Sequence, residues 1–335
     1  MNTSSGNNAP TTSPHVATSS QTSPGKPLVS VCMITYNHGA FICQAIESVL
    51  NQKTSFPVEL VIGEDCSTDN TRSIAVHYRD LYPDRIRLLL PEANIGMQQN
   101  FVQTYRTCSG QYIAMLEGDD YWTSEDKLQK QVDFMKAHPE CTICFHDAEA
   151  LDILSGEKTP YREEKPAEIT TLPDLLKTNY LPTCATMYRN NIEIVFPDWF
   201  YTLKMCDWPM HVFYAEHGAI GYIDADMATY RMHPGGVWSL KDPVWTSEEL
   251  VKMYHRLDEH LKFRFTHDIH AAISLCNRYR GYHALRHKKY DIAWKMYMSA
   301  LRSNPRFLAD RYFCMDILSL CKQRLSSRRS GSRGA

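Results

Sequence analysis

Residues 28–71 read LVSVCMITYNHGAFICQAIESVLNQKTSFPVELVIGEDCSTDNT, and the architecture of the chain can be inferred outward from them. Two short apolar runs, LVSVCMIT and VELVIG, each end in polar residues and precede a segment with helical spacing. In the first such segment Ile42, Ile46 and Val49 fall on one helical face. Continuous apolar runs are typical of parallel strands covered on both faces, so the stretch predicts βα units around a parallel sheet.

The same alternation continues along the chain and predicts an α/β class. Polar clusters recur where the predicted strands end, and open α/β sheets bind their ligands at that edge. Further strands are predicted at 86–90, 111–120, 141–152, 181–189 and 219–232, a helix at 206–218 and an exposed polar loop at 155–166.

Beyond the α/β segment the β signals stop, and the sequence predicts four parts. An N-terminal tail, 1–27, is rich in Ser, Thr, Asn and Pro, too poor in large apolar groups to fold. The α/β domain spans 28–242, an all-α extension 243–325, and a short basic tail 326–335. The end of the extension resembles one helix pair of the tetratricopeptide kind, which needs a neighbour to cover it.

Composition excludes several classes of protein. The 335 residues carry a formal net charge of −2, which argues against a nucleic-acid partner because such proteins usually show a basic surface. No stretch approaches the roughly 18 apolar residues of a membrane-spanning helix. Eleven scattered cysteines and the lack of a charged start followed by an apolar run favour the reducing cytoplasm. The Cys141–Cys144 pair lacks partners at zinc spacing, so buried thiols are expected.

Four segments in order resemble the family 2 glycosyltransferases, which have the GT-A fold and transfer a sugar from a nucleotide diphosphate. They are VSVCMITYNHGAFICQAIESVLNQ (29–52), VELVIGEDCSTDNT (58–71), YIAMLEGDDYWTSEDKLQKQVDF (112–134) and CDWPMHVFYAEHGAIGYIDADMATYRMHPGGVWS (206–239). The resemblance covers about residues 28–240, and the fourth segment is similar to a branch that builds bacterial surface polysaccharides. It implies a mixed, mostly parallel sheet flanked by helices.

The resemblance implies a metal site in EGDD. Asp119 would hold Mn²⁺ or Mg²⁺, Glu117 would replace the first Asp of the family's DxD motif and face the ribose, and Asp120 would support the site. His233 matches a histidine that completes the metal site or touches the diphosphate. A divalent cation at this place would stabilise the negative charge that the leaving diphosphate gains. Taken alone, EGDD could instead be an acidic turn that caps the next helix.

The resemblance also assigns the nucleotide end of the site. Asp65, with Glu64 beside it, would accept a hydrogen bond from the base, since a carboxylate can pair with an imide N–H. The alternative that Ser67, Thr68 and Asp69 cap the following helix is compatible with this role. Four further predicted contacts follow the first and third strands, with Tyr36 as a stacking face: Thr35, Tyr36, Asn37 and Asn94.

A general base is expected at Asp207, which stands at the start of a predicted helix whose dipole favours the ionised carboxylate. Without the other motifs Asp207 would be interpreted as a helix N-cap. Trp208 would support the site, and Trp238 would close over the donor. A single displacement driven by one base would invert the anomeric carbon.

The expected activity is therefore metal-assisted transfer of a sugar to a hydroxyl of a glycan or lipid-linked acceptor. The expected donor is a UDP-sugar. Lys322, Arg324, Arg328, Arg329 and Arg333 follow an apolar stripe, which suits peripheral contact with an anionic membrane at its inner face. Two alternatives stay open: an inactive sugar-binding scaffold and a sugar nucleotidyltransferase. A dinucleotide-dependent dehydrogenase and a P-loop enzyme are excluded by the absence of GxGxxG and GxxxxGK[ST].

Overall fold

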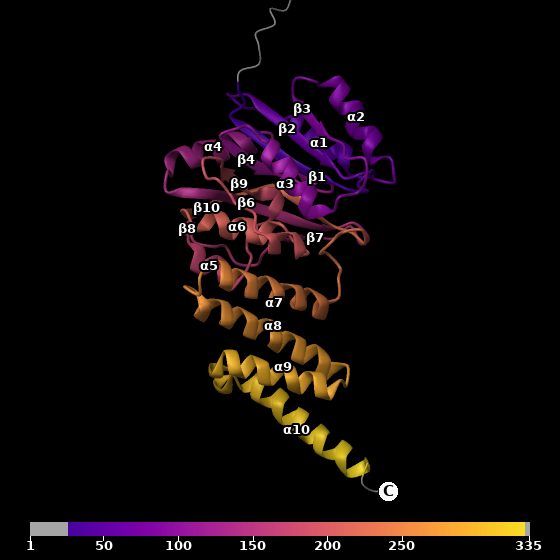
Figure 1. Cartoon of the computed structure of the whole chain (residues 1–335), viewed down its shortest axis with the longest axis vertical. Coiled ribbons are helices and arrows are strands. Elements are labelled where there is room, and N and C mark those ends of the chain that lie inside the picture. The colour runs from indigo at the N-terminus through magenta and orange to yellow at the C-terminus, as the bar shows by residue number, and fades with distance from the viewer. Residues whose placement is uncertain (1–25, 332–335) are drawn as a thin grey trace, which may run out of the picture.

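The structure, a computed structural model, describes residues 26–331, with side chains up to Gln323 (Figure 1). Its centre is one mixed sheet with the strand order β3-β2-β1-β4-β9-β6-β10-β5, in which β7 pairs with β6 and β8 with β10. The pairs β3–β2, β2–β1, β1–β4 and β6–β10 are parallel. The strands are β1 (Val29–Thr35), β2 (Val58–Glu64), β3 (Ile86–Leu89), β4 (Tyr112–Met115), β5 (Tyr121–Trp122), β6 (Cys141–Asp152), β7 (Lys158–Pro160), β8 (Ile169–Thr170), β9 (Met187–Arg189) and β10 (Ala219–Met232).

The first strands are buried on both faces, as their unbroken apolar sequence predicts. Successive residues of β1 enter different hydrophobic cores: Val31 and Met33 pack in one, and Cys32 packs in the other. Helix α1 (Ile42–Leu50) covers the first core with side chains at helical spacing, Ile46 and Val49 among them. The flanking helices of the α/β part are α2 (Thr71–Leu81), α3 (Met97–Thr107), α4 (Lys127–Ala137), α5 (Leu172–Lys177) and α6 (Asp207–Ala215).

Two predicted strands are shorter in the structure, and one predicted loop contains a strand. The strand expected at 111–120 ends at Met115, because the chain turns so that Gly118 N donates to Ile34 O at 3.0 Å. The segment 181–189 forms a 3₁₀ turn, Thr183–Ala185, before β9 begins. The exposed loop expected at 155–166 contains the short strand β7.

The C-terminal part is helical, as predicted, and its helices follow one another away from the sheet (Figure 1). Helices α7 (Pro243–His260) and α8 (Thr266–Arg286) contribute Tyr254 and Ile273 to the larger core of the α/β part. A separate small core joins α9 (Tyr290–Ser303), the 3₁₀ turn Pro305–Ala309 and α10 (Arg311–Gly331). The extension therefore packs on the sheet through α7 and α8 first.

The predicted tails fall largely outside the described residues. The N-terminal tail, 1–27, overlaps the structure only at residues 26 and 27. The basic tail predicted from 326 is corrected in part, because helix α10 runs on to Gly331. Within residues 26–331, no helical segment combines the length and hydropathy that crossing a membrane requires.

Candidate active site

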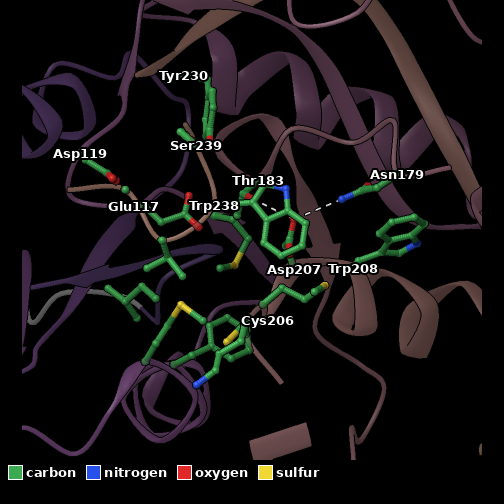
Figure 2. A pocket seen from close by; sticks show the side chains of 18 of the residues that line it. Glu117, Asp119, Asn179, Thr183, Cys206, Asp207, Trp208, Tyr230, Trp238 and Ser239 are labelled. Carbon is green, nitrogen blue, oxygen red and sulfur yellow. Dashed lines mark hydrogen bonds between the residues drawn. The ribbon is translucent and has the colours of Figure 1, made fainter. Parts of the chain in front are cut away.

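A cavity of about 770 Å³ opens where β1, β2 and β4 end, the edge that the sequence predicts to bind ligands (Figure 2). Ten of the thirteen predicted site residues line it, and Asn37, Glu64 and His233 do not. The ten are Thr35, Tyr36, Asp65, Asn94, Glu117, Asp119, Asp120, Asp207, Trp208 and Trp238. Residues at the ends of or after β1, β2, β3, β4 and β10, and residues at the start of α6, thus meet in one space.

The predicted nucleotide contacts of Glu64 and Asn37 are corrected by their hydrogen bonds. Glu64 is fully buried, forms an ion pair with Arg72 and accepts a hydrogen bond from Ser67 N at 2.6 Å. Asn37 has a φ of 56°, and its Oδ1 accepts a hydrogen bond from Thr68 N at 2.8 Å. Both side chains therefore hold the loop after β2 rather than face the cavity.

Asp65, unlike Glu64, lines the cavity. Its Oδ1 accepts from Ile95 N at 2.8 Å and its Oδ2 from Gly96 N at 2.9 Å, while Asn94 Nδ2 donates to the Asp65 backbone oxygen at 2.9 Å. Burial raises the pKa of Asp65 although these N–H groups oppose the change. Each carboxylate oxygen keeps a second lone pair that can accept a further hydrogen bond.

A cluster of buried carboxyls follows β4. Burial, together with the charges of Asp120 and Asp119, raises the pKa of Glu117 well above its ordinary value. Asp120 is buried as well, and its Oδ1 accepts a hydrogen bond from Arg231 N at 2.8 Å. Since helix α4 begins after Asp126, the EGDD turn does not cap it, and that alternative interpretation is wrong.

Asp119 forms a potential metal site with two histidines, and the residues present fit a cation. His233 Nε2 lies 3.0 Å and His38 Nε2 lies 3.5 Å from Asp119 Oδ2, and one ligand atom from each residue falls within 4.8 Å of the others. Burial would raise the pKa of Asp119, but His38 and His233 outweigh it and hold the pKa below its ordinary value. His38 Nδ1 is buried without a hydrogen-bond partner.

His38 was not among the predicted site residues. It stands three residues after Thr35 in the same TYNH stretch, so its position was visible, but nothing in that pattern marks it as a ligand. Its partners come from far along the chain, since Asp119 follows β4 and His233 follows β10. Only the pairing of these strands in one sheet brings the three together.

Asp207 is the first residue of α6, and its side chain lies apart from that of Asp119 (Figure 2). Its Oδ2 accepts long hydrogen bonds from Asn179 Nδ2 at 3.2 Å and Thr183 Oγ1 at 3.4 Å. The N-cap residue is Cys206, and it makes no side-chain cap, so the N-cap interpretation of Asp207 is not supported. The carboxylate lines the cavity from the N-terminus of α6.

Two tryptophans border the same cavity. Trp208 is buried, donates from Nε1 to Leu175 O at 3.3 Å and packs edge-on against Tyr254 of α7. Trp238 lies in the segment between β10 and α7, and its ring is 5.9 Å from that of Trp245. The helices of the extension also line the cavity, a contribution that the sequence did not reveal.

Comparison with known proteins agrees with this geometry. Residues 30–194 match the model of the family described as glycosyl transferase family 2. The chain belongs to this family. The resemblance inferred from the four sequence segments, and the α/β GT-A fold that it implied, are confirmed.

Individual relatives and one solved structure extend the comparison. An uncharacterized Mycobacterium tuberculosis protein is 34% identical over 63% of this chain and 60% of its own length. TuaG of Bacillus subtilis, named a teichuronic acid biosynthesis glycosyltransferase, is 35% identical over 48% of this chain and 62% of its own length. The chain therefore spans only about three fifths of these relatives. Staphylococcus aureus TarS, solved with UDP, shares the fold at a TM-score of 0.57, with 16% identity and 92% of each chain covered.

Proposed function

We propose that this chain transfers a sugar from a nucleotide-diphosphate donor to a hydroxyl of a surface-polysaccharide precursor, with inversion at the anomeric carbon. The observation that carries the proposal is a single cavity lined by His38 and Asp119, two members of the His–Asp–His trio, and also by the Asp207 carboxylate. Family membership and the name of TuaG support the reaction class and its setting.

The donor end is assigned from the chemistry of its side chains. Asp65 can accept a hydrogen bond from an imide N–H, as uracil offers, and the structure of TarS with UDP is consistent with a UDP-sugar. Tyr36, which is 42% exposed at the cavity, provides an aromatic face for the base or ribose.

Asp119, His38 and His233 would hold a divalent cation. When bound, it would stabilise the charge that develops on the leaving diphosphate. Two imidazoles and one carboxylate suit Mn²⁺ better than Mg²⁺, since Mg²⁺ prefers oxygen ligands and keeps several waters. We therefore narrow the predicted pair of metals to Mn²⁺.

Asp207 would act as the general base. Its carboxylate takes the proton of the acceptor hydroxyl while the hydroxyl oxygen forms a bond to the anomeric carbon. The bond from that carbon to the diphosphate oxygen breaks, and the nucleoside diphosphate leaves with the electron pair. A single displacement of this kind inverts the configuration. Asn179 and Thr183 orient the carboxylate through the hydrogen bonds they donate.

A panel of UDP-, GDP- and dTDP-sugars tests the donor end without knowledge of the acceptor. We expect slow hydrolysis and thermal stabilisation with one nucleotide class, dependent on Mn²⁺ and lost in excess chelator. Stabilisation by a donor without any hydrolysis or transfer would favour a sugar-binding scaffold, and release of inorganic diphosphate from a nucleoside triphosphate and a sugar phosphate would favour a nucleotidyltransferase.

Peripheral membrane contact through the C-terminal helices is a further part of the proposal. Four apolar side chains on α10 and the turn before it are 60–64% exposed: Leu308, Tyr312, Met315 and Leu318. Lys322 follows them in the sequence. Removal of α10 would disturb α9 as well, because Phe313 of α10 packs against Tyr297 of α9. The substitution Leu318→Glu is therefore the better probe, and it should lower binding to phosphatidylglycerol vesicles. Absence of vesicle binding by the unchanged protein would remove this contact.

A further inference from the structure

The three side chains of the proposed metal site come from three separate segments of the chain. His38 lies between β1 and α1, Asp119 lies between β4 and β5, and His233 directly follows β10. A cation needs its ligand atoms at fixed distances, so these segments must be held in place relative to one another. One residue on β10 bonds to both of the other segments: Arg231, which is 7% exposed and stands two residues before His233.

Arg231 holds the segment between β4 and β5 through two hydrogen bonds. Its Nη1 donates to the backbone oxygen of Asp119 at 2.6 Å, and its backbone N donates to Asp120 Oδ1 at 2.8 Å. Its Cζ also lies 4.3 Å from the ring centre of Tyr121, which is the geometry of a cation–π contact. Because the guanidinium bonds to the backbone oxygen of Asp119, the carboxylate of that residue remains available to the two histidines.

The other arm of the same guanidinium reaches the start of α1. Its Nη2 donates to Gln44 Oε1, and its Cζ lies 5.1 Å from the ring centre of Phe41. His38 is tied to this helix start, because its backbone oxygen accepts hydrogen bonds from Phe41 N at 2.8 Å and from Ile42 N at 2.9 Å. The Phe41 ring also packs against the ring of His233, with 4.9 Å between their centres. This arm therefore fixes the segment that carries the first histidine.

We propose that Arg231 is a positioning residue of the metal site. Its guanidinium sets the distance between the His38 and Asp119 segments, and its own strand sets the place of the third ligand. The inference rests on the proposed function and deepens its metal site. The role requires arginine, since only a planar guanidinium offers donors in two fixed directions. A lysine would keep the positive charge but would present one nitrogen in place of the two that meet the acceptors here.

Titration of the full chain with Mn²⁺, followed by electron paramagnetic resonance, tests the proposal without any turnover. Arg231→Lys should weaken Mn²⁺ binding by about 10–100-fold, the range for residues that orient metal ligands. Gln44→Ala removes only the contact to α1, and Gln44 is exposed, so this change leaves the core intact. We expect Gln44→Ala to weaken Mn²⁺ binding by less than about tenfold, because the Asp119 segment is still held.

Arg189→Lys is the matched control. The Arg189 guanidinium also bonds to backbone oxygens of separate segments: Nη2 donates to Met135 O at 2.7 Å and Nε to Cys141 O at 3.1 Å. Its Cζ lies 5.6 Å from the ring centre of Tyr112. Arg189 is on β9 and does not line the cavity. The control should therefore show a melting temperature lowered about as much as that of Arg231→Lys, but it should keep the Mn²⁺ affinity of the unchanged protein.

The outcomes separate this inference from the proposed function. Failure of the unchanged protein to bind Mn²⁺ would contradict the metal site itself, and the inference with it. Mn²⁺ binding that Arg231→Lys leaves unchanged would overturn the positioning role alone. Equal losses of Mn²⁺ affinity in Arg231→Lys and Arg189→Lys would overturn it as well, because the loss would then reflect general stability. Should Arg231→Lys fail to fold, Gln44→Ala decides, and unchanged Mn²⁺ affinity in that variant overturns the positioning role.

Discussion

The substitution Asp207→Asn separates the chemical step from binding. Asparagine has nearly the shape of aspartate, and its amide oxygen can still accept the hydrogen bonds of Asn179 and Thr183. What it loses is the ability to take a proton from the acceptor hydroxyl. We therefore expect donor affinity to survive and turnover to fail.

The expected losses of rate and of stability can be estimated separately. A positioned general base contributes about 10²–10⁴ in rate, which corresponds to about 3–5 kcal/mol in the activation free energy. The effect on folding is far smaller, because the two retained hydrogen bonds are long and the lost helix-terminal charge is worth about 0.3–1 kcal/mol. A fall in rate of three decades therefore cannot be explained by unfolding.

Three measurements on the same preparation are needed: UDP affinity with Mn²⁺ present, the rate of sugar transfer at saturating donor and acceptor, and the free energy of unfolding in urea. Asp198→Asn is the matched control, because Asp198 also begins a helical turn but does not line the cavity. The reasoning is refuted if Asp207→Asn transfers sugar at nearly the rate of the control, since another group must then act as the base.

Three further predictions concern the metal, pH and packing. His38→Ala and His233→Ala should each weaken Mn²⁺ binding, measured by electron paramagnetic resonance titration. The loss should exceed the roughly 10–100-fold contributed by a residue that only hydrogen-bonds to a metal ligand. Unchanged Mn²⁺ affinity in either variant would show that its histidine is not a ligand. Burial lowers the pKa of His211 to about 4 from 6.5, so the unfolded chain binds the proton more readily and stability falls as the pH drops below 6.5. Between pH 7 and pH 5 this one group should lower the free energy of unfolding by about 2 kcal/mol, a loss that His211→Gln should abolish in urea titrations at the two pH values. Gly63→Ala would place a Cβ 2.0 Å from Thr104 Oγ1, so we expect a destabilisation of about 1–3 kcal/mol by urea titration, whereas an unchanged midpoint would mean that α3 can shift.

The order of the elements, and the edge of the sheet at which the site lies, can be inferred from local properties of the sequence. Apolar runs and helical spacing are local properties, so β1, α1 and β2 could be predicted within a residue or two. The acids Asp65 and Asp119 could be placed in one site because they follow strand ends, and Asp207 because its segment resembles a motif of the same family; all three line the cavity.

Side-chain direction, by contrast, was decided by the tertiary structure. Glu64 and Asp65 are neighbours in a motif of paired acids, yet one turns to Arg72 and the other lines the cavity. Adjacent residues at the end of a strand point to opposite sides, and which side is open depends on what the rest of the chain packs there.

Long-range proximity was likewise invisible in the sequence. His233 meets Asp119 across 114 positions, and His38 joins them only because β1 and β4 are neighbours in the sheet while β10 pairs with β5, the short strand that follows Asp119 and Asp120. Leu275 and Tyr279 line the cavity only because of the way α8 packs on the α/β part. Periodicity specifies which residues share a face of a helix, but only the packed structure specifies what that face meets.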